Sequence, residues 1–274
     1  MRDGGDDSTD SRGDGLLILK LGGSVITDKD TPETVDDDAL DSVVSAIAAT
    51  GSTASDTTAT AGKDGNPGLI IVHGGGSFGH VHAAEHGVST TEGSHDPAAV
   101  TAIHGAMQQL NGVVIDRLQT AGINAVPVHP LSAVARGDDA TLSLPTAAVA
   151  GLLGEGFVPV LHGDVIAHAG EGVTVLSGDE LVTGLAERLG ATRVGLCSTV
   201  PGVLDAEGEV IASITDFESV AAALGDSEST DVSGGMAGKV RELLALSGTA
   251  RIFGPDAVGP FLAGDAPGTL IDGD

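Results

Sequence analysis

Short apolar runs that end in glycine-rich turns constrain the fold of this chain more than any other feature. Leu16 to Leu21 leads into Gly22-Gly23-Ser24, and Leu69 to Val72 is followed closely by Gly74-Gly75-Gly76. Short apolar runs bounded by turn residues are typical of strands buried on both faces. Both runs are therefore predicted to be central strands that end in tight turns.

Helical patterns alternate with these runs along the chain. Residues 36–49 and 97–121 are predicted helices, and Asp96 with Pro97 is a suitable start for the second. Alternation with short connections favours a mostly parallel sheet covered on both faces. We therefore expect an α/β fold, a three-layer αβα sandwich with a mostly parallel central sheet. Further predicted strands are 123–128, 157–161, 192–197, 250–253 and 268–271, further predicted helices are 77–87, 146–154, 179–189 and 233–246, and 164–176 is a predicted hairpin.

The length suits one domain with two segments outside its core. A chain of 274 residues can bury a full core without disulfides. Residues 1–14 lack apolar periodicity and are expected to form a disordered acidic tail. Residues 50–67 are small and polar, so we expect a flexible surface insertion there. Residues 15–274 then form a single domain.

The charge balance excludes several kinds of partner. The chain has 39 acidic and 12 basic residues, a net charge of −27. This charge disfavours nucleic acid and anionic membranes as partners. It also makes the folded chain repel itself unless salt screens the charges, and at 1 M salt the screening length is only about 3 Å. We interpret the composition as adaptation to a salt-rich cytoplasm.

The sequence also predicts the compartment. No apolar run approaches the roughly 18 residues that a membrane span needs, and the N-terminus is polar and acidic rather than signal-like. A single cysteine, Cys197, excludes an internal disulfide and lies in an apolar run, where a buried strand thiol is expected. We expect a cytoplasmic protein.

Lysine is scarce, and its placement is informative. Of the four lysines, Lys20, Lys29 and Lys239 lie in or beside glycine-rich segments. Glycine turns expose backbone N–H groups, and a helix start adds a positive dipole, so both favour phosphate. Lys20 ends an apolar strand, which is costly unless its ammonium reaches an anion. The sequence thus predicts anion chemistry at these turns.

Two other motifs admit different interpretations. Gly74, Gly76 and Gly79 satisfy the G-x-G-x-x-G spacing of dinucleotide-binding proteins, but no acidic residue ends a following strand at the expected distance. His82 to His86 reads H-x-x-E-H, an inverted zinc-protease pattern, but the match is short and the chain is histidine-rich here, so a polar, partly exposed helix face is the favoured interpretation.

Four segments together resemble the amino-acid-kinase family. They are Lys20 to Ser24, Gly74 to Gly76, Gly178-Asp179 and Gly234 to Lys239, and they occur in that family's order from about residue 15 onward. The resemblance implies an αβα sandwich that holds the acceptor in its N-terminal part and ATP in its C-terminal part. It also implies Mg²⁺ and assembly into a homodimer.

The string His73 to His80, with Lys20 and Lys29 in KLGGSVITDK, is similar to the branch of the family that phosphorylates isopentenyl phosphate to isopentenyl diphosphate. This small-molecule substrate is the one that the resemblance implies. The resemblance also implies that Lys20, Leu21, Gly22, Gly23, Ser24, Gly76, Asp179, Gly235 and Lys239 contact ATP, that Gly75, His80 and Gly163 hold the acceptor, and that Lys20, Lys29, His80 and Lys239 act in catalysis.

The chemistry of a phosphate acceptor agrees with these residue types. A phosphate monoester has its second pKa near 6, so it is largely dianionic at neutral pH and needs no general base. It needs cations that bring two polyanions together. No protein ligand of the metal is assigned. Two alternatives remain open: another family kinase acting on a carboxylate, a nucleoside monophosphate or a different phosphate monoester, and a non-catalytic storage or sensor protein. Apolar Ile103, Met107 and Leu110 in the helix predicted over 97–121 favour an apolar acceptor over a nucleotide.

Overall fold

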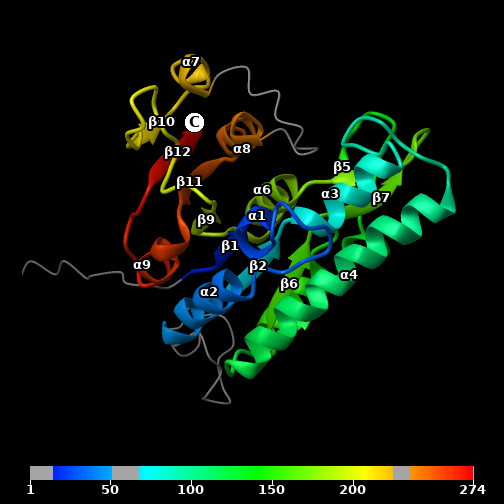
Figure 1. Cartoon of the computed structure of the whole chain (residues 1–274), viewed down its shortest axis with the longest axis horizontal. Coiled ribbons are helices and arrows are strands. Elements are labelled where there is room, and N and C mark those ends of the chain that lie inside the picture. The colour runs from blue at the N-terminus through cyan, green and yellow to red at the C-terminus, as the bar shows by residue number, and fades with distance from the viewer. Residues whose placement is uncertain (1–14, 51–67, 225–234, 274) are drawn as a thin grey trace, which may run out of the picture.

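The computed structural model describes residues 15–50, 68–224 and 235–273 (Figure 1). The predicted tail over 1–14 and nearly all of the predicted insertion over 50–67 lie outside the described residues, as do Ser233 and Gly234, the first two residues of the helix predicted over 233–246.

The predicted mostly parallel sheet is present. Every neighbouring pair of strands is parallel except β11 and β12, which are antiparallel. Central β1 pairs with β2 and β9, with Leu21 opposite His73 and Cys197. In spatial order the strands are β10 (Ser213–Ile214), β12 (Thr269–Gly273), β11 (Gly248–Phe253), β9 (Arg193–Cys197), β1 (Leu17–Leu21), β2 (Leu69–His73), β6 (Val158–His162) and β3 (Ala125–Pro127).

Helices cover both faces of this sheet, as expected for three layers. The helices are α1 (Gly23–Ile26), α2 (Asp37–Ala49), α3 (Gly76–Glu85), α4 (Pro97–Thr120), α5 (Ala147–Gly154), α6 (Gly178–Leu189), α7 (Ala221–Leu224), α8 (Gly235–Leu244) and α9 (Val258–Leu262), with 3₁₀ turns at Pro130–Ser132 and Pro255–Ala257.

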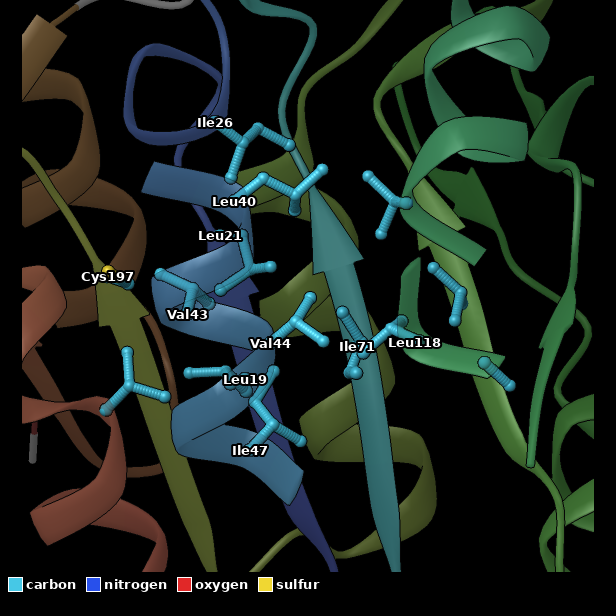
Figure 2. Close-up of a cluster of buried hydrophobic side chains, with 14 of the residues drawn as sticks. Leu19, Leu21, Ile26, Leu40, Val43, Val44, Ile47, Ile71, Leu118 and Cys197 are labelled. Atoms are coloured by element: carbon cyan, nitrogen blue, oxygen red, sulfur yellow. The ribbon is translucent and has the colours of Figure 1, made fainter. Parts of the chain in front are cut away.

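Alternate residues of β1 show why the layers form. Leu19 and Leu21 pack in one apolar cluster with α2, α4 and α9, while Ile18 packs in a second with α5, α6 and α8. Figure 2 shows the first cluster, where Val44 and Ile47 of α2 lie against Leu19 and Ile71. Successive side chains of a strand point to opposite faces, so a strand that is apolar throughout needs cover on both sides.

Capping residues explain where the long helices begin. The Asp36 carboxylate accepts from the Ala39 amide at 3.0 Å, and the Ser177 hydroxyl accepts from Glu180 at 3.1 Å. Asp96 caps α4 in the same way and Pro97 is its first residue, as predicted. Each cap satisfies an amide that the helix itself leaves unbonded.

A second, smaller sheet was only partly predicted. The hairpin expected over 164–176 is β7 (Asp164–His168) with β8 (Gly172–Leu176), and it joins β5 (Leu142–Ser143) and β4 (Ala135–Arg136). The last two strands have two residues each, too few to show a period in the sequence. The sheet packs its Val165 with Ala99 and Ile103 of α4, so it flanks the N-terminal half of that helix.

Cys197 is buried, and burial raises the pKa of its thiol to about 12, so it is an inert strand thiol as predicted. Within the parts of the chain that the structure describes, no helix is both long and apolar enough to cross a membrane.

Candidate active site

A cavity of about 270 Å³ lies at the carboxyl ends of four adjacent parallel strands. Its wall includes the residues that follow β1, β2, β6 and β9, namely Gly22–Ser24, Gly74–Gly75, Gly163–Asp164 and Ser198–Val200. Ligands of open α/β sheets bind at this edge, where the turns leave the strands. The fold therefore brings together the segments that the sequence singled out separately.

The first two glycine turns touch each other. A Cβ atom on Gly23 would lie 2.1 Å from the amide nitrogen of Gly76, and one on Gly74 would lie 2.6 Å from the amide nitrogen of Gly23. Gly76 also has φ +48°, which favours glycine. Only residues without side chains allow this approach, which explains why the two turns consist largely of glycine.

Backbone amides with no acceptor gather at this cavity. The N–H groups of Gly23, Ser24, Gly75, Gly178 and Asp179 belong to residues of its wall and donate to no oxygen of the described residues. Two of them open α6, where the helix dipole is positive. Backbone amides without an internal acceptor at a helix start and at glycine turns suit an anion, above all phosphate.

Lys20 and Asp179 form a buried ion pair across 159 residues of sequence. The Lys20 ammonium lies 2.6 Å from an Asp179 carboxylate oxygen, and the two side chains are 6% and 3% exposed. A Cβ on Gly178 would lie 3.0 Å from Lys20 Cε, so this glycine leaves room for the lysine stem. The expectation that the buried ammonium reaches an anion is confirmed, and in this structure the anion is a carboxylate.

The remaining predicted cations lie around the same cavity. Lys29, His80 and Lys239 all line it, and the Lys239 ammonium contacts the Gly235 carbonyl at 3.3 Å. The loop that carries Lys29 is tied to α3, because Glu33 N donates to Ser77 O at 3.0 Å. One cavity thus holds three lysines and a histidine from four different segments.

Nearly all predicted site residues meet here, and two do not. Leu21 is fully buried in the core, and Gly76 packs against Gly23, so neither lines the cavity. The predicted residues that do line it are Lys20, Gly22, Gly23, Ser24, Lys29, Gly75, His80, Gly163, Asp179, Gly235 and Lys239.

An apolar wall adjoins these polar groups. Ala83, Ile103 and Met107 line the cavity, together with Val175 of β8. A Cβ on Gly79 would lie 2.6 Å from Met107 Sδ, so this glycine lets Met107 approach α3. Of the apolar residues that the sequence suggested for the acceptor, Ile103 and Met107 reach the cavity. Leu110 does not, because it packs in the core.

Some wall residues were not predicted. Asp164 and Val175 come from the second sheet, and Ser198 to Val200 follow β9. The position of Ser198 to Val200 directly after a predicted strand is a signal that could have indicated them, because parallel strands end at one edge of a sheet. Asp164 lies shortly after the strand predicted over 157–161 and could have been indicated in the same way, whereas nothing local in the sequence marks Val175.

The two alternative motif interpretations lose support. His82 Nε2 lies 2.5 Å from a Glu33 carboxylate oxygen, and the described residues contain no group of three or more His, Cys, Asp or Glu that could hold a metal. The strand that follows α4 ends at Pro127 rather than at an acidic residue, as a dinucleotide site would need.

Backbone amides without an internal acceptor and three lysines line one cavity beside an apolar wall, which suits phosphoryl transfer to a small acceptor, so fold and site together define a small-molecule kinase of the αβα class. A sequence profile of the amino acid kinase family matches residues 15–252, and the chain belongs to this family.

Within this family, the chain is similar to several isopentenyl phosphate kinases. An isopentenyl phosphate kinase of Haloferax volcanii is 58% identical over 259 residues, which cover 94% of this chain and 99% of that protein. One of Methanothermobacter thermautotrophicus is 36% identical over 85% of this chain and 87% of its own length. The structure also resembles an X-ray structure of isopentenyl phosphate kinase, with a TM-score of 0.77 and 29% identity over 93% of this chain and 99% of the other.

Proposed function

We propose that this protein transfers the γ-phosphoryl group of ATP to isopentenyl phosphate, giving isopentenyl diphosphate and ADP. One observation carries the proposal: a single cavity joins three lysines and His80 to an apolar wall of Ala83, Ile103 and Met107. An acceptor with a dianionic head and a short hydrocarbon tail matches both halves of that cavity. The high identity to the Haloferax enzyme supports the same acceptor.

The reaction needs charge neutralisation more than acid–base catalysis. An oxygen of the acceptor phosphate attacks the γ-phosphorus, and the bond from that phosphorus to the β–γ bridging oxygen breaks. Both reactants are polyanions, so the lysine ammoniums and the imidazole bring them together and stabilise the equatorial oxygens in transfer. In this proposal His80 and the amide of Gly75 hold the acceptor phosphate with Gly163 beside it, and Lys29 neutralises the transferring group.

In this proposal the ATP phosphates contact both the first glycine turn and the C-terminal helix α8. Gly22 to Ser24 and Lys20 approach the ATP phosphates, with Gly235 and Lys239 of α8 on the other side. Asp179 pairs with Lys20 at 2.6 Å and so fixes the direction of its ammonium. Contacts of Leu21 and Gly76 with ATP stay predictions, and both would have to use the main chain.

Mg²⁺ accompanies ATP in this proposal. The Asp179 carboxylate is engaged by Lys20, and the described residues offer no cluster of three ligands for the metal. Phosphate oxygens of the nucleotide would then supply most of its coordination, and the bound ion would neutralise phosphate charge.

The setting of the enzyme is also proposed. Residues 15–274 act as one domain, with the acceptor in the N-terminal part and ATP in the C-terminal part. We expect a homodimer in a salt-rich cytoplasm, where the net charge of −27 is screened.

An acceptor panel tests the proposed activity. ADP release is measured in molar KCl with isopentenyl phosphate, N-acetylglutamate, carbamate and a nucleoside monophosphate, each at the same concentration. The proposal predicts the highest kcat/KM with isopentenyl phosphate. A higher value with a carboxylate or a nucleotide would assign another activity of the family, and no acceptor-dependent ADP release would favour a non-catalytic protein.

A further inference from the structure

Four histidines form a layer directly behind the cavity. The histidine layer comprises His73, His104, His129 and His162, and two polar residues, Asn111 and Asp164, join it. The ring centroids of His129 and His162 are 5.2 Å apart, and those of His73 and His162 are 5.6 Å apart. His73 ends β2 and His162 ends β6, so each immediately precedes a glycine of the cavity wall.

The two strand-end histidines are fully buried and uncharged. His73 and His162 have no exposed surface, and burial lowers the pKa of each to about 4. Each ring is therefore a neutral imidazole near pH 7, with one nitrogen as donor and the other as acceptor. Their hydrogen bonds decide which nitrogen has which role.

Both rings must donate through Nδ1. His73 Nδ1 lies 3.1 Å from the Gly74 carbonyl oxygen, and His162 Nδ1 lies 2.8 Å from the Gly163 carbonyl oxygen. A carbonyl can only accept, so each Nδ1 carries the hydrogen. The Nε2 atoms then accept, one from the Asn111 amide at 3.1 Å and the other from His129 Nδ1 at 2.8 Å.

Two series of hydrogen bonds therefore end on the carbonyls of the two turns. One runs from Asn111 through His73 to the Gly74 carbonyl, and the other runs from His129 through His162 to the Gly163 carbonyl. The turns are also joined directly, because Gly163 N donates to the His73 carbonyl at 3.0 Å. The layer thus hydrogen-bonds to the main chain of both turns.

We infer that His73 and His162 are positioning residues that hold the carbonyls of Gly74 and Gly163 toward the interior and so keep the acceptor-binding turns in an anion-compatible orientation. A carbonyl dipole facing a dianion would repel it, whereas an N–H group attracts it. Glycine has little intrinsic preference for either orientation, both in the run Gly74–Gly76 and at the single Gly163, so an external donor can select one. The inference rests on the proposed function for the identity of the anion.

Asp164 is held by the same layer. Its carboxylate accepts from His104 Nδ1 at 2.9 Å, from Val165 N at 2.9 Å and from Leu131 N at 3.2 Å. The carboxylate also raises the pKa of His104. These donors offset a negative charge in the wall of a cavity that would otherwise repel phosphate.

Matched substitutions at position 162 test the positioning role. His162→Asn keeps a side-chain N–H where Nδ1 stands, and His162→Leu keeps a similar volume without a donor. We expect His162→Leu to raise KM for isopentenyl phosphate about tenfold, the ordinary effect of one lost buried hydrogen bond, with KM for ATP within about twofold. His162→Asn should recover most of the loss. His168→Leu, which alters a β7 histidine bonded to Thr174, serves as the control and should change neither KM.

If the wild type is active and His162→Asn and His162→Leu have the same KM for isopentenyl phosphate, the inference is overturned. A second measurement needs no variant and no turnover. ¹⁵N NMR of the histidine-labelled wild-type protein at pH 7 should show His73 and His162 neutral with hydrogen on Nδ1. Hydrogen on Nε2 or a protonated ring would contradict the inference. Failure of the wild type to phosphorylate isopentenyl phosphate would instead contradict the proposed function. The NMR measurement does not depend on turnover, so it would still test whether His73 and His162 donate to the Gly74 and Gly163 carbonyls.

Discussion

At the scale of single residues, lysine is so scarce that the position of each lysine is informative about function. The chain has 12 basic residues against 39 acidic ones, yet Lys20, Lys29 and Lys239 line one cavity. The sequence could predict that these residues serve an anion. It could not predict the Lys20–Asp179 pair, because 159 residues separate its members and only the folded sheet brings α6 to β1.

The three lysines should each be needed for turnover. We expect Lys20→Ala, Lys29→Ala and Lys239→Ala to lower kcat by about 10² or more, because phosphoryl transfer depends on electrostatic stabilisation. Steady-state kinetics in molar KCl measure this. Arg117→Ala is the control, since Arg117 pairs with Asp37 and Asp41 away from the cavity and its loss should leave kcat unchanged. Near-normal kcat in Lys29→Ala would remove its assigned role.

His80 should govern the acceptor rather than the nucleotide. It lies within the second turn of α3, follows the glycine turn and lines the cavity, so an imidazole there can reach a phosphate. We expect His80→Ala to nearly abolish activity with isopentenyl phosphate. His80→Gln should keep more activity because its amide can still donate one hydrogen bond, and KM for ATP should change little in both. The assignment fails if kcat/KM for the acceptor in His80→Ala stays within about threefold of wild type, an effect smaller than one lost hydrogen bond.

At the scale of elements, apolar patterns and capping residues predicted the longer helices and strands and missed the shortest ones. β1, β2 and α4 have strong apolar patterns or clear caps, and the structure confirms them. The one-turn helix α1 was predicted as part of a turn, because four residues show no period. The resemblance implied that Leu21 contacts ATP, yet its side chain faces the core, since Lys20 and Leu21 point to opposite faces of the strand.

The contact between the first two glycine turns should tolerate no side chain. A Cβ on Gly23 would meet the Gly76 amide nitrogen at 2.1 Å, so Gly23→Ala must push the turns apart. We expect this variant to lose measurable turnover and to be less stable. Gly112→Ala is the control, because Gly112 is an exposed glycine inside α4 with nothing within 4 Å of its added Cβ. It should keep kcat and gain up to about 1 kcal/mol of stability. Wild-type kcat in Gly23→Ala would contradict the contact.

The histidine layer should make the fold sensitive to acid. The pKa values of His73 and His162, about 4, lie below the ordinary 6.5, so the unfolded chain binds more protons between those values. The free energy of unfolding should therefore fall as pH drops from about 6.5 to about 4. His104, whose pKa is raised by Asp164, has the opposite sign and adds stability below its ordinary pKa.

Denaturant titrations at several pH values in molar KCl measure this slope. Comparison with His162→Asn removes the contribution of the many surface carboxylates, which both proteins share. The wild-type slope should be the steeper of the two. Identical slopes would show that His162 does not titrate on unfolding in this range.

At the scale of the whole molecule, net charge sets the conditions under which the fold holds. A charge of −27 on 274 residues favours expansion in dilute buffer. We expect loss of secondary structure at low salt and recovery above about 1 M KCl, where the screening length is near 3 Å. Circular-dichroism melts across a KCl series measure this. A melting temperature independent of salt would contradict adaptation to a salt-rich cytoplasm.

Phosphorus NMR tests the proposed phosphoryl transfer directly. The purified protein is incubated in molar KCl with ATP, Mg²⁺ and isopentenyl phosphate, and the phosphorus resonances are followed with time. We expect the acceptor monophosphate signal to be replaced by the two coupled signals of a diphosphate while ADP forms in equal amount. An unchanged monophosphate signal, with or without ADP, would contradict the proposed reaction.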